Sequence, residues 1–234
     1  MGLIKSDKSI IPALDVEGIA RLKEIVSATA GVEGIGAYKV GFELAIPYGL
    51  KKVVQEIRRL SDKPVIYDHQ KAATDIPATG AKFAQACRAS GVDAVILFPQ
   101  AGPETEKAWI KAVQDEGLGL IVGGEMTHPA YLETDGGFLK ADAPKRMYEI
   151  ACDLGVKDFV VPGNKPEKIL EYKKLFDEKG VDSTLYSPGL IAQGGKITDS
   201  GKAAGKKWHA IVGRAIYQAE DVKKAAEELA KELG

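Results

Sequence analysis

Short apolar runs alternate with longer amphipathic stretches along the whole chain, and this alternation constrains the fold more than any other feature. Eight runs have the length and residue types of β-strands, namely 9–15, 37–40, 64–68, 94–97, 118–122, 158–161, 183–186 and 210–212. The stretches between them carry apolar residues at the spacing of one helix face. They predict helices over 18–30, 47–60, 76–90, 143–153, 166–179 and 221–233.

Strands and helices in this order predict a parallel sheet. Consecutive parallel strands are joined by right-handed helical crossovers, and eight such units are the number that closes a barrel. We therefore predict a (β/α)₈ TIM barrel. No low-complexity linker or shift of composition divides the sequence, so we expect one domain over residues 1–234. A doubly wound open sheet is the alternative that the same pattern allows.

Charge and cysteine content narrow the class of function. The 32 Lys and Arg residues nearly balance the 33 Asp and Glu residues, which argues against general capture of nucleic acid but allows a local pocket for one phosphate. Cys87 and Cys152 lie in helix-like stretches, and we expect buried thiols in a reducing compartment rather than a disulfide. No signal peptide or membrane-spanning stretch is evident, so we expect a cytoplasmic protein without a membrane partner.

Polar residues at the carboxyl ends of the predicted strands are the candidates for a functional site, because catalytic side chains of such barrels project from there. They are Asp15, Lys39, Asp68, Lys71, Asp75, Thr127, His128, Gln193 and Arg214. His209 precedes the eighth strand at the opposite rim, and we expect it to be structural. The three histidines show no metal-ligand spacing, so we expect no metal site.

The segment after the third predicted strand carries Asp68, Lys71 and Asp75 within eight residues. A solvated charged loop would explain this segment alone. Asp15 and Lys39, however, follow neighbouring strands, so all five side chains are expected over one barrel mouth. Two lysines among three carboxylates would form a nearly neutral network, in which the flanking negative charge keeps each lysine protonated.

Taken in order, these residues resemble the signature of single-domain, archaeal-type orotidine 5′-monophosphate decarboxylases. The charged part is Asp15 in Ala-Leu-Asp, Lys39 in Lys-Val-Gly, and the segment 68–79. Met-Thr-His-Pro at 126–129 resembles the family's base-recognition segment. Ser-Pro-Gly-Leu-Ile-Ala-Gln-Gly-Gly at 187–195 resembles its phosphate loop, and Val-Gly-Arg-Ala-Ile-Tyr at 212–217 resembles its phosphate-arginine motif. The resemblance covers nearly the whole chain.

The resemblance implies a lyase of pyrimidine biosynthesis that converts orotidine 5′-monophosphate to uridine 5′-monophosphate (UMP) and CO₂ without metal or organic cofactor. Lys71 would stabilise the carbanion at C6 and protonate it beside Asp68, while Lys39 orients Asp68. Asp75 and Thr79 would reach the site of a neighbouring subunit, which implies a homodimer. The implied substrate-binding residues are Asp15 at the ribose, Thr127 at the base, Gln193 between base and phosphate, and Gly194, Gly195, Gly213, Arg214 and Tyr217 at the phosphate.

One spacing departs from the family pattern. The family has Asp-x-Lys-x-x-Asp, whereas Asp68, Lys71 and Asp75 are separated by one more residue in each interval. In a regular strand, positions i and i+3 point to opposite faces, so Lys71 joins Asp68 only if a bulge or turn at His69 and Gln70 absorbs the extra residue.

Two other functions remain open for the same barrel. One is a Mg²⁺-dependent sugar-phosphate decarboxylase or aldolase-type synthase, which needs acidic metal ligands at strand ends. In metal-dependent relatives of the family an acid stands where this chain has Lys39, and a cation there would repel Mg²⁺. The other is a non-catalytic barrel that binds a nucleotide, which the lengthened spacing around Lys71 would favour.

Overall fold

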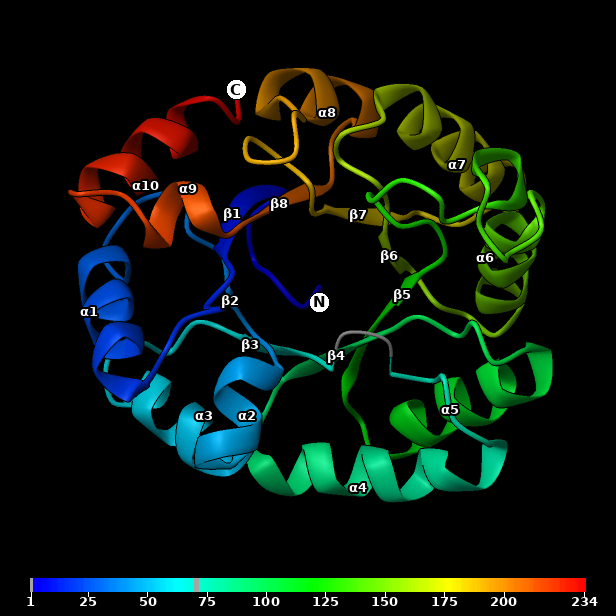
Figure 1. Cartoon of the computed structure of the whole chain (residues 1–234), viewed down its shortest axis with the longest axis horizontal. Helices are drawn as coiled ribbons and strands as arrows, with labels where there is room; N and C mark the ends of the chain where they lie inside the picture. Colours follow the sequence, from blue (N-terminus) through cyan, green and yellow to red (C-terminus); the bar gives the residue numbers. More distant parts are fainter. Residues whose placement is uncertain (1, 70–71) are drawn as a thin grey trace.

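The structure is a computed structural model that describes residues 2–69 and 72–234. In that part of the chain, eight parallel strands form a sheet in the order β1-β8-β7-β6-β5-β4-β3-β2. β1 and β2, at the two ends of this order, are joined by bridges between Ile10 and Ile35 and between Ala13 and Lys39, so the sheet closes on itself. The predicted (β/α)₈ barrel is confirmed, and the open sheet is excluded (Figure 1). The strands are β1 Lys8–Pro12, β2 Tyr38–Val40, β3 Val65–Asp68, β4 Ala94–Leu97, β5 Gly119–Gly123, β6 Asp158–Val160, β7 Thr184–Ser187 and β8 Trp208–Val212.

Helices surround the barrel as an outer ring (Figure 1). They are α1 Ile19–Thr29, α2 Phe42–Tyr48, α3 Leu50–Arg58, α4 Gly80–Ser90, α5 Pro103–Asp115, α6 Ala143–Asp153, α7 Pro166–Glu178, α8 Ile197–Ala204, α9 Arg214–Tyr217 and α10 Val222–Lys231, with 3₁₀ turns η1 Pro77–Thr79 and η2 Glu133–Asp135. The helix predicted over 47–60 is confirmed as α3, but its predicted start is wrong, because residues 47 and 48 belong to α2. Gly49, with a φ of 78°, separates α2 from α3, because this left-handed backbone conformation cannot continue a helix.

Side chains that point into the barrel come from every second position of the strands. Ile11, Ile66, Ile96, Ile121 and Ile211 belong to one buried cluster that fills the barrel interior. Because successive side chains of a strand alternate between faces, residues two or four positions further along point inward at the mouth. The interior packing therefore directs the charged residues at the carboxyl-terminal side of β1, β2 and β3 over the barrel axis.

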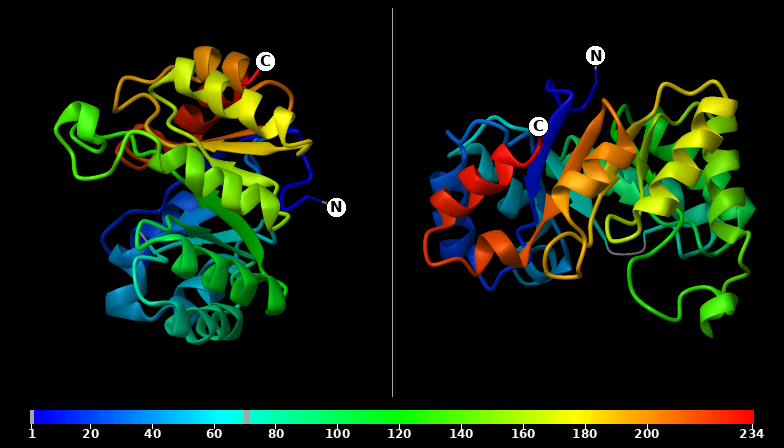
Figure 2. Two further views of the ribbon diagram at one scale, coloured as in Figure 1. Left: turned by 90° about the vertical axis from the view of Figure 1, so that its right-hand side faces the viewer. Right: turned by 90° about the horizontal axis from the view of Figure 1, so that it is seen from above.

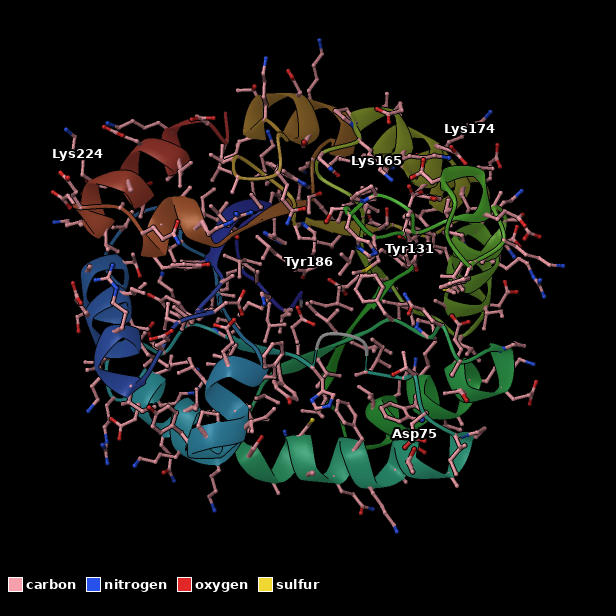
Figure 3. All side chains as sticks on the ribbon, viewed as in Figure 1. Asp75, Tyr131, Lys165, Lys174, Tyr186 and Lys224 are labelled. Atoms are coloured by element: carbon pink, nitrogen blue, oxygen red, sulfur yellow. The ribbon has the colours of Figure 1, made fainter. Side chains whose placement is uncertain are left out.

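The opposite end of the barrel is closed by buried polar side chains. His209 on β8 is 2% exposed, and its Nδ1 lies 2.8 Å from Ser9 Oγ on β1. The hydroxyl of Tyr186 donates to Asp158 Oδ1 at 2.9 Å, and Figure 3 shows Tyr186 near the barrel axis. Burial lowers the pKa of His209 to about 4. This histidine is therefore neutral and structural, at the rim away from the candidate site.

The buried His209 gives the fold an expected pH dependence. Its pKa is about 4 when folded and near its ordinary value of 6.5 when unfolded, so the unfolded chain binds the proton more tightly. Stability should therefore fall as the pH falls from about 6.5 toward 4. Between pH 7 and pH 4.5 we expect this histidine to remove about 2 kcal/mol of the free energy of unfolding.

Urea unfolding of the wild type and of His209→Gln at both pH values isolates this contribution. Burial raises the pKa of Asp158, which acts in the opposite sense, but Asp158 is present in both proteins and cancels in the comparison. The variant should lose about 2 kcal/mol less than the wild type between the two pH values. Equal losses in the two proteins would show that His209 does not titrate differently on unfolding.

Cys87 on α4 and Cys152 on α6 are buried and free, as predicted from the sequence. Burial raises the pKa of these thiols to about 12 and about 11, so both remain protonated at neutral pH. The segment 124–142 projects from the barrel between β5 and α6, as Figure 2 shows in green. Among the described helices, none is both long and apolar enough to cross a bilayer.

Candidate active site

A cavity of about 240 Å³ opens at the carboxyl ends of the strands. One side of it is lined by Asp15, Lys39 and Asp68. Asp15 follows β1, Lys39 lies within the short strand β2, and Asp68 is the last residue of β3. The other side is formed by the segments after β7 and β8, which contribute Gln193 and Arg214. The mouth thus combines a compact charged cluster with the loop after β7 and a guanidinium group.

Lys39 is the centre of the charged cluster. Its Nζ lies 3.2 Å and 3.3 Å from the two carboxylate oxygens of Asp15 and 3.3 Å from Oδ2 of Asp68. The lysine is 5% exposed. Burial alone would lower the pKa of Lys39, but the charges of Asp68 and Asp15 outweigh this effect and raise it above its ordinary value. Lys39 is therefore a fixed ammonium group that holds two carboxylates in place.

Apolar side chains form the floor of the cavity, and the sequence analysis did not single them out. They are Ile96, Phe98, Val160, Leu190 and Ile211. Ile96 and Phe98 lie on β4 and directly after it, at the same strand-end positions where polar residues were sought. The inward alternation of β4 could have identified them. They give the charged cluster a wall from which water is excluded, which strengthens the electrostatic interactions nearby.

The loop after β7 is held by its own backbone. The amide of Ile191 donates to the carbonyl of Gly195 at 2.7 Å, and the amide of Gly194 donates to the carbonyl of Ile191 at 3.0 Å. Ile191 has a φ of 60°, which β-branched residues rarely adopt, so this loop conformation is strained. A Cβ at Gly195 would lie 2.6 Å from the carbonyl oxygen of Gly163, so only glycine fits there.

The Met-Thr-His-Pro segment after β5 contacts this loop. A Cβ at Gly189 would lie 2.6 Å from the side-chain methyl of Thr127, which shows how closely the two segments pack. The carbonyl of Thr127 accepts a hydrogen bond from Asn164 Nδ2 at 3.1 Å. His128 is exposed and packs edge-on against Tyr131. Thr127 is therefore beside the loop and its glycines, while His128 lies outside the mouth cavity as the structure describes it.

The segment after β8 contributes Gly213, Arg214 and Tyr217, which all line the mouth. Arg214 is exposed, and its Nη2 lies 3.5 Å from the carbonyl oxygen of Ala192 in the loop after β7. Arg21 on α1 donates to the carbonyl of Tyr217 at 2.6 Å and fixes this segment to the outer ring. The exposed guanidinium group of Arg214 thus lies at the edge of the mouth, beside the loop after β7.

Five of the predicted site residues that the structure describes do not line the mouth cavity of their own chain. Thr127, Gly194 and Gly195 lie in the segments beside it, whereas Asp75 and Thr79 lie away from it. Asp75 is exposed, its carboxylate accepts a hydrogen bond from the amide of Ile76, and its carbonyl accepts one from Thr105 on α5. Thr79 donates to the carbonyl of Ile76 at 2.8 Å. Figure 3 shows Asp75 outside the ring of strands, near α5. A site formed by one chain alone would therefore lack Asp75 and Thr79.

Lys71, the residue expected to donate the proton, lies outside the described residues, as does Gln70 of the expected bulge. The neighbouring residues are described. The hydroxyl of Tyr67 is hydrogen-bonded to Nδ1 of His69. Ala73 has a φ of 70°, so the chain turns within the lengthened interval between Lys71 and Asp75.

The cavity lies at the end of the barrel where enzymes of this fold bind their substrates, and it combines buried charges with an arginine and a glycine-rich loop. These features define a TIM-barrel enzyme with a site suited to a phosphorylated small molecule. Residues 8–229 match the model of the orotidine 5′-phosphate decarboxylase / HUMPS family. The chain belongs to this family.

Individual relatives are similar to the chain over nearly its full length. The chain is 35% identical over 229 residues to the orotidine 5′-phosphate decarboxylase of Methanosarcina barkeri. This alignment covers 96% of this chain and 94% of the relative. It is 34% identical to that of Methanocaldococcus jannaschii, over 92% of this chain and 93% of the relative. The crystal structure of the latter protein complexed with the inhibitor BMP superposes with a TM-score of 0.83 at 31% identity, covering 97% of this chain and 99% of that one.

Among the described residues, no group of three or more His, Cys, Asp or Glu side chains is arranged to hold a metal ion. The acidic residues nearest the mouth centre, Asp15 and Asp68, both contact the ammonium group of Lys39. The position that a divalent cation would need between these carboxylates is therefore filled by a lysine.

Proposed function

We propose that the chain converts orotidine 5′-monophosphate to UMP and CO₂ in pyrimidine biosynthesis, as a cytoplasmic single-domain enzyme. Family membership over residues 8–229 and full-length relatives with this activity support the reaction. The observation that carries the assignment to this site is the buried Lys39 ammonium between Asp15 and Asp68 at the barrel mouth. Such a cluster presents fixed charges to a substrate in a place with little water.

The reaction requires one bond to break and one to form at C6 of the pyrimidine. When the bond between C6 and the carboxylate breaks, its electron pair stays on C6 and CO₂ departs. Lys71 would stabilise this pair as a protonated amine and then donate its proton to C6. Asp68 would lie beside the substrate carboxylate, where the repulsion between like charges is relieved as CO₂ leaves. Lys39 would hold Asp68 in this position.

The rest of the substrate would be bound around this centre. Asp15 would accept a hydrogen bond from a ribose hydroxyl, and Thr127 would contact the pyrimidine. Gln193 would bridge base and phosphate from the loop after β7. The phosphate would be bound by Gly194, Gly195, Gly213, Arg214 and Tyr217, with backbone amides and the guanidinium group as donors.

The active unit would be a homodimer. Asp75 and Thr79 lie outside the mouth of their own chain, and Ile76 between them is 59% exposed. A second copy packed against this segment would cover Ile76 and receive Asp75 and Thr79 at its own mouth. This arrangement would bring the exposed Asp75 carboxylate, which within its own chain accepts a hydrogen bond from the amide of Ile76, to a substrate.

A metal-dependent reaction on the same barrel is the competing function, because the family model also covers the HUMPS branch. The ammonium group of Lys39 between the two mouth carboxylates argues against it, since it repels a divalent cation. The test is to add orotidine 5′-monophosphate to the purified chain and follow the loss of its ultraviolet absorbance. Turnover that survives a chelator supports the proposal. Turnover that depends on added Mg²⁺, or binding without turnover, would overturn it.

Arg214→Ala is expected to weaken substrate binding. A guanidinium group that pairs with a phosphate contributes through charge-assisted hydrogen bonds, so we expect KM to rise about 10²-fold. Steady-state kinetics measures the change, and Arg88→Ala, which removes an exposed arginine from α4, is the matched control. An unchanged KM in Arg214→Ala would indicate that the phosphate is bound elsewhere.

A further inference from the structure

A second cavity, of about 150 Å³, lies between α5 and α6 and is separate from the barrel mouth. Figure 1 shows these two helices side by side in the outer ring. Glu106 on α5 and Arg146, Met147 and Ile150 on α6 line it, and Leu139 of the projecting segment 124–142 closes one side. None of these residues lines the mouth cavity, so the two cavities do not share a wall.

Glu106 is the unusual residue of this cavity. It is 1% exposed, and its Oε1 has no hydrogen-bond partner in the described part of the chain. Arg146 lines the same cavity but forms no ion pair with it among the described residues. A buried carboxyl group without a partner destabilises a fold, so natural proteins retain such groups mainly where something else satisfies them. The side chain is thus available to a molecule that enters the cavity.

The surroundings of Glu106 determine which kind of molecule the cavity can bind. Burial raises the pKa of Glu106 to about 8, so at neutral pH the group is a neutral acid with one O–H donor and one carbonyl acceptor. Arg146 at the same cavity disfavours a cationic ligand. Met147, Ile150 and Leu139 offer apolar surfaces to a flat ring. A group that donates and accepts side by side matches the adjacent N–H and C=O of a cyclic amide.

We propose that this cavity binds a small planar cyclic amide of the free pyrimidine class, with its N–H/C=O edge on Glu106 and its ring between the apolar side chains of α6 and Leu139. The cavity holds a single ring and is too small for a nucleotide. The choice of a pyrimidine among cyclic amides rests on the proposed function, whereas the site itself does not.

The cavity adjoins the segment that carries Thr127. Gln100 lines the cavity, and its Nε2 donates to the hydroxyl of Tyr131 at 2.9 Å. That hydroxyl donates in turn to the carbonyl of Gly124 at 2.7 Å, directly after β5. A bound ring would therefore contact Gln100, which is connected to the start of this segment through the hydroxyl of Tyr131.

Binding of uracil to the full-length chain tests the site. Calorimetric titration is done with UMP in excess, so that the barrel mouth is occupied and no turnover contributes heat. We expect one uracil per chain with a dissociation constant on the order of 1 mM, as suits a ligand of one ring. Because the measurement needs no catalysis, its failure is distinct from a failure of the decarboxylase assay.

Three variants test whether uracil binds through the side chain of Glu106. Glu106→Leu removes the donor and the acceptor and should weaken uracil binding at least ~10-fold, as expected for a lost buried hydrogen bond. Glu106→Gln keeps a donor and an acceptor, so its dissociation constant for uracil should be within a few-fold of that of the wild type. The affinity of the wild type for uracil should fall above pH 8, whereas that of Glu106→Gln should not. Glu104→Gln, on the exposed side of α5, should bind like the wild type. No saturable binding to the wild type, or full binding to a folded Glu106→Leu, would overturn the proposal.

Discussion

Lys71→Ala is expected to lower kcat for orotidine 5′-monophosphate by at least ~10⁴-fold while the chain still binds UMP. On the proposed mechanism, the variant would lack both the positive charge opposite the C6 carbanion and the proton that quenches it, whereas the proposed contacts to ribose and phosphate would remain. Steady-state turnover gives the first quantity, and calorimetric titration with UMP gives the second. Normal turnover in this variant would remove Lys71 from the mechanism.

Mixing two inactive variants tests the proposed homodimer. Lys71→Ala and Asp75→Asn are each expected to be nearly inactive alone, because in the proposed homodimer each would remove one half of a site shared between subunits. In a mixed dimer, one of the two sites has the native Lys71 from one chain and the native Asp75 from the other. Activity should therefore reappear when the two variants are mixed and allowed to exchange subunits. Mixtures that stay inactive after confirmed exchange would contradict the shared site.

Lys39→Met is expected to lower kcat/KM by about 10³-fold, because it leaves the Asp15 and Asp68 carboxylates facing one another without the ammonium group that separates them. The repulsion would move Asp68 away from the position that the reaction needs. The methionine side chain has a similar length, so the loss arises from charge rather than from an empty space.

The matched control for this variant is Lys23→Met. Lys23 also pairs with a buried carboxylate, Glu56, at 2.8 Å, but it lies on α1 away from the mouth. Circular dichroism and urea unfolding of both variants show whether the fold is retained. Lys23→Met should keep its activity. If folded Lys39→Met retained activity as well, the cluster at the mouth would not be part of the reaction.

The barrel could be predicted from the sequence because each strand is a short apolar run and most of the long helices show their own periodicity, although α5 and the short helices α2, α8 and α9 were not predicted. The same alternation predicted that Asp15, Lys39 and Asp68 would meet at one mouth, since strand ends of a parallel barrel converge there. The ion pairs of Lys39 with both carboxylates then followed from the inward direction of three neighbouring strands.

Other features depend on contacts that no local pattern records. The break at Gly49 required the backbone conformation, because Pro47 had suggested a helix start there. Ile96 and Phe98 line the mouth, but in the sequence their residue types are indistinguishable from those of the buried apolar residues of any strand. Glu106 looks like an ordinary surface charge beside Glu104 and Lys107 in the sequence, and only the packing of α6 buries it.

The central claim is that a protonated lysine at the barrel mouth stabilises negative charge at C6 of the pyrimidine. If so, the enzyme should also remove the C6 proton of its product slowly and return a solvent proton to the same carbon. Proton NMR of UMP incubated with the chain in D₂O measures this exchange directly. The account predicts deuterium at C6 with the wild type and none above background with Lys71→Ala. Equal exchange in the two proteins would contradict it.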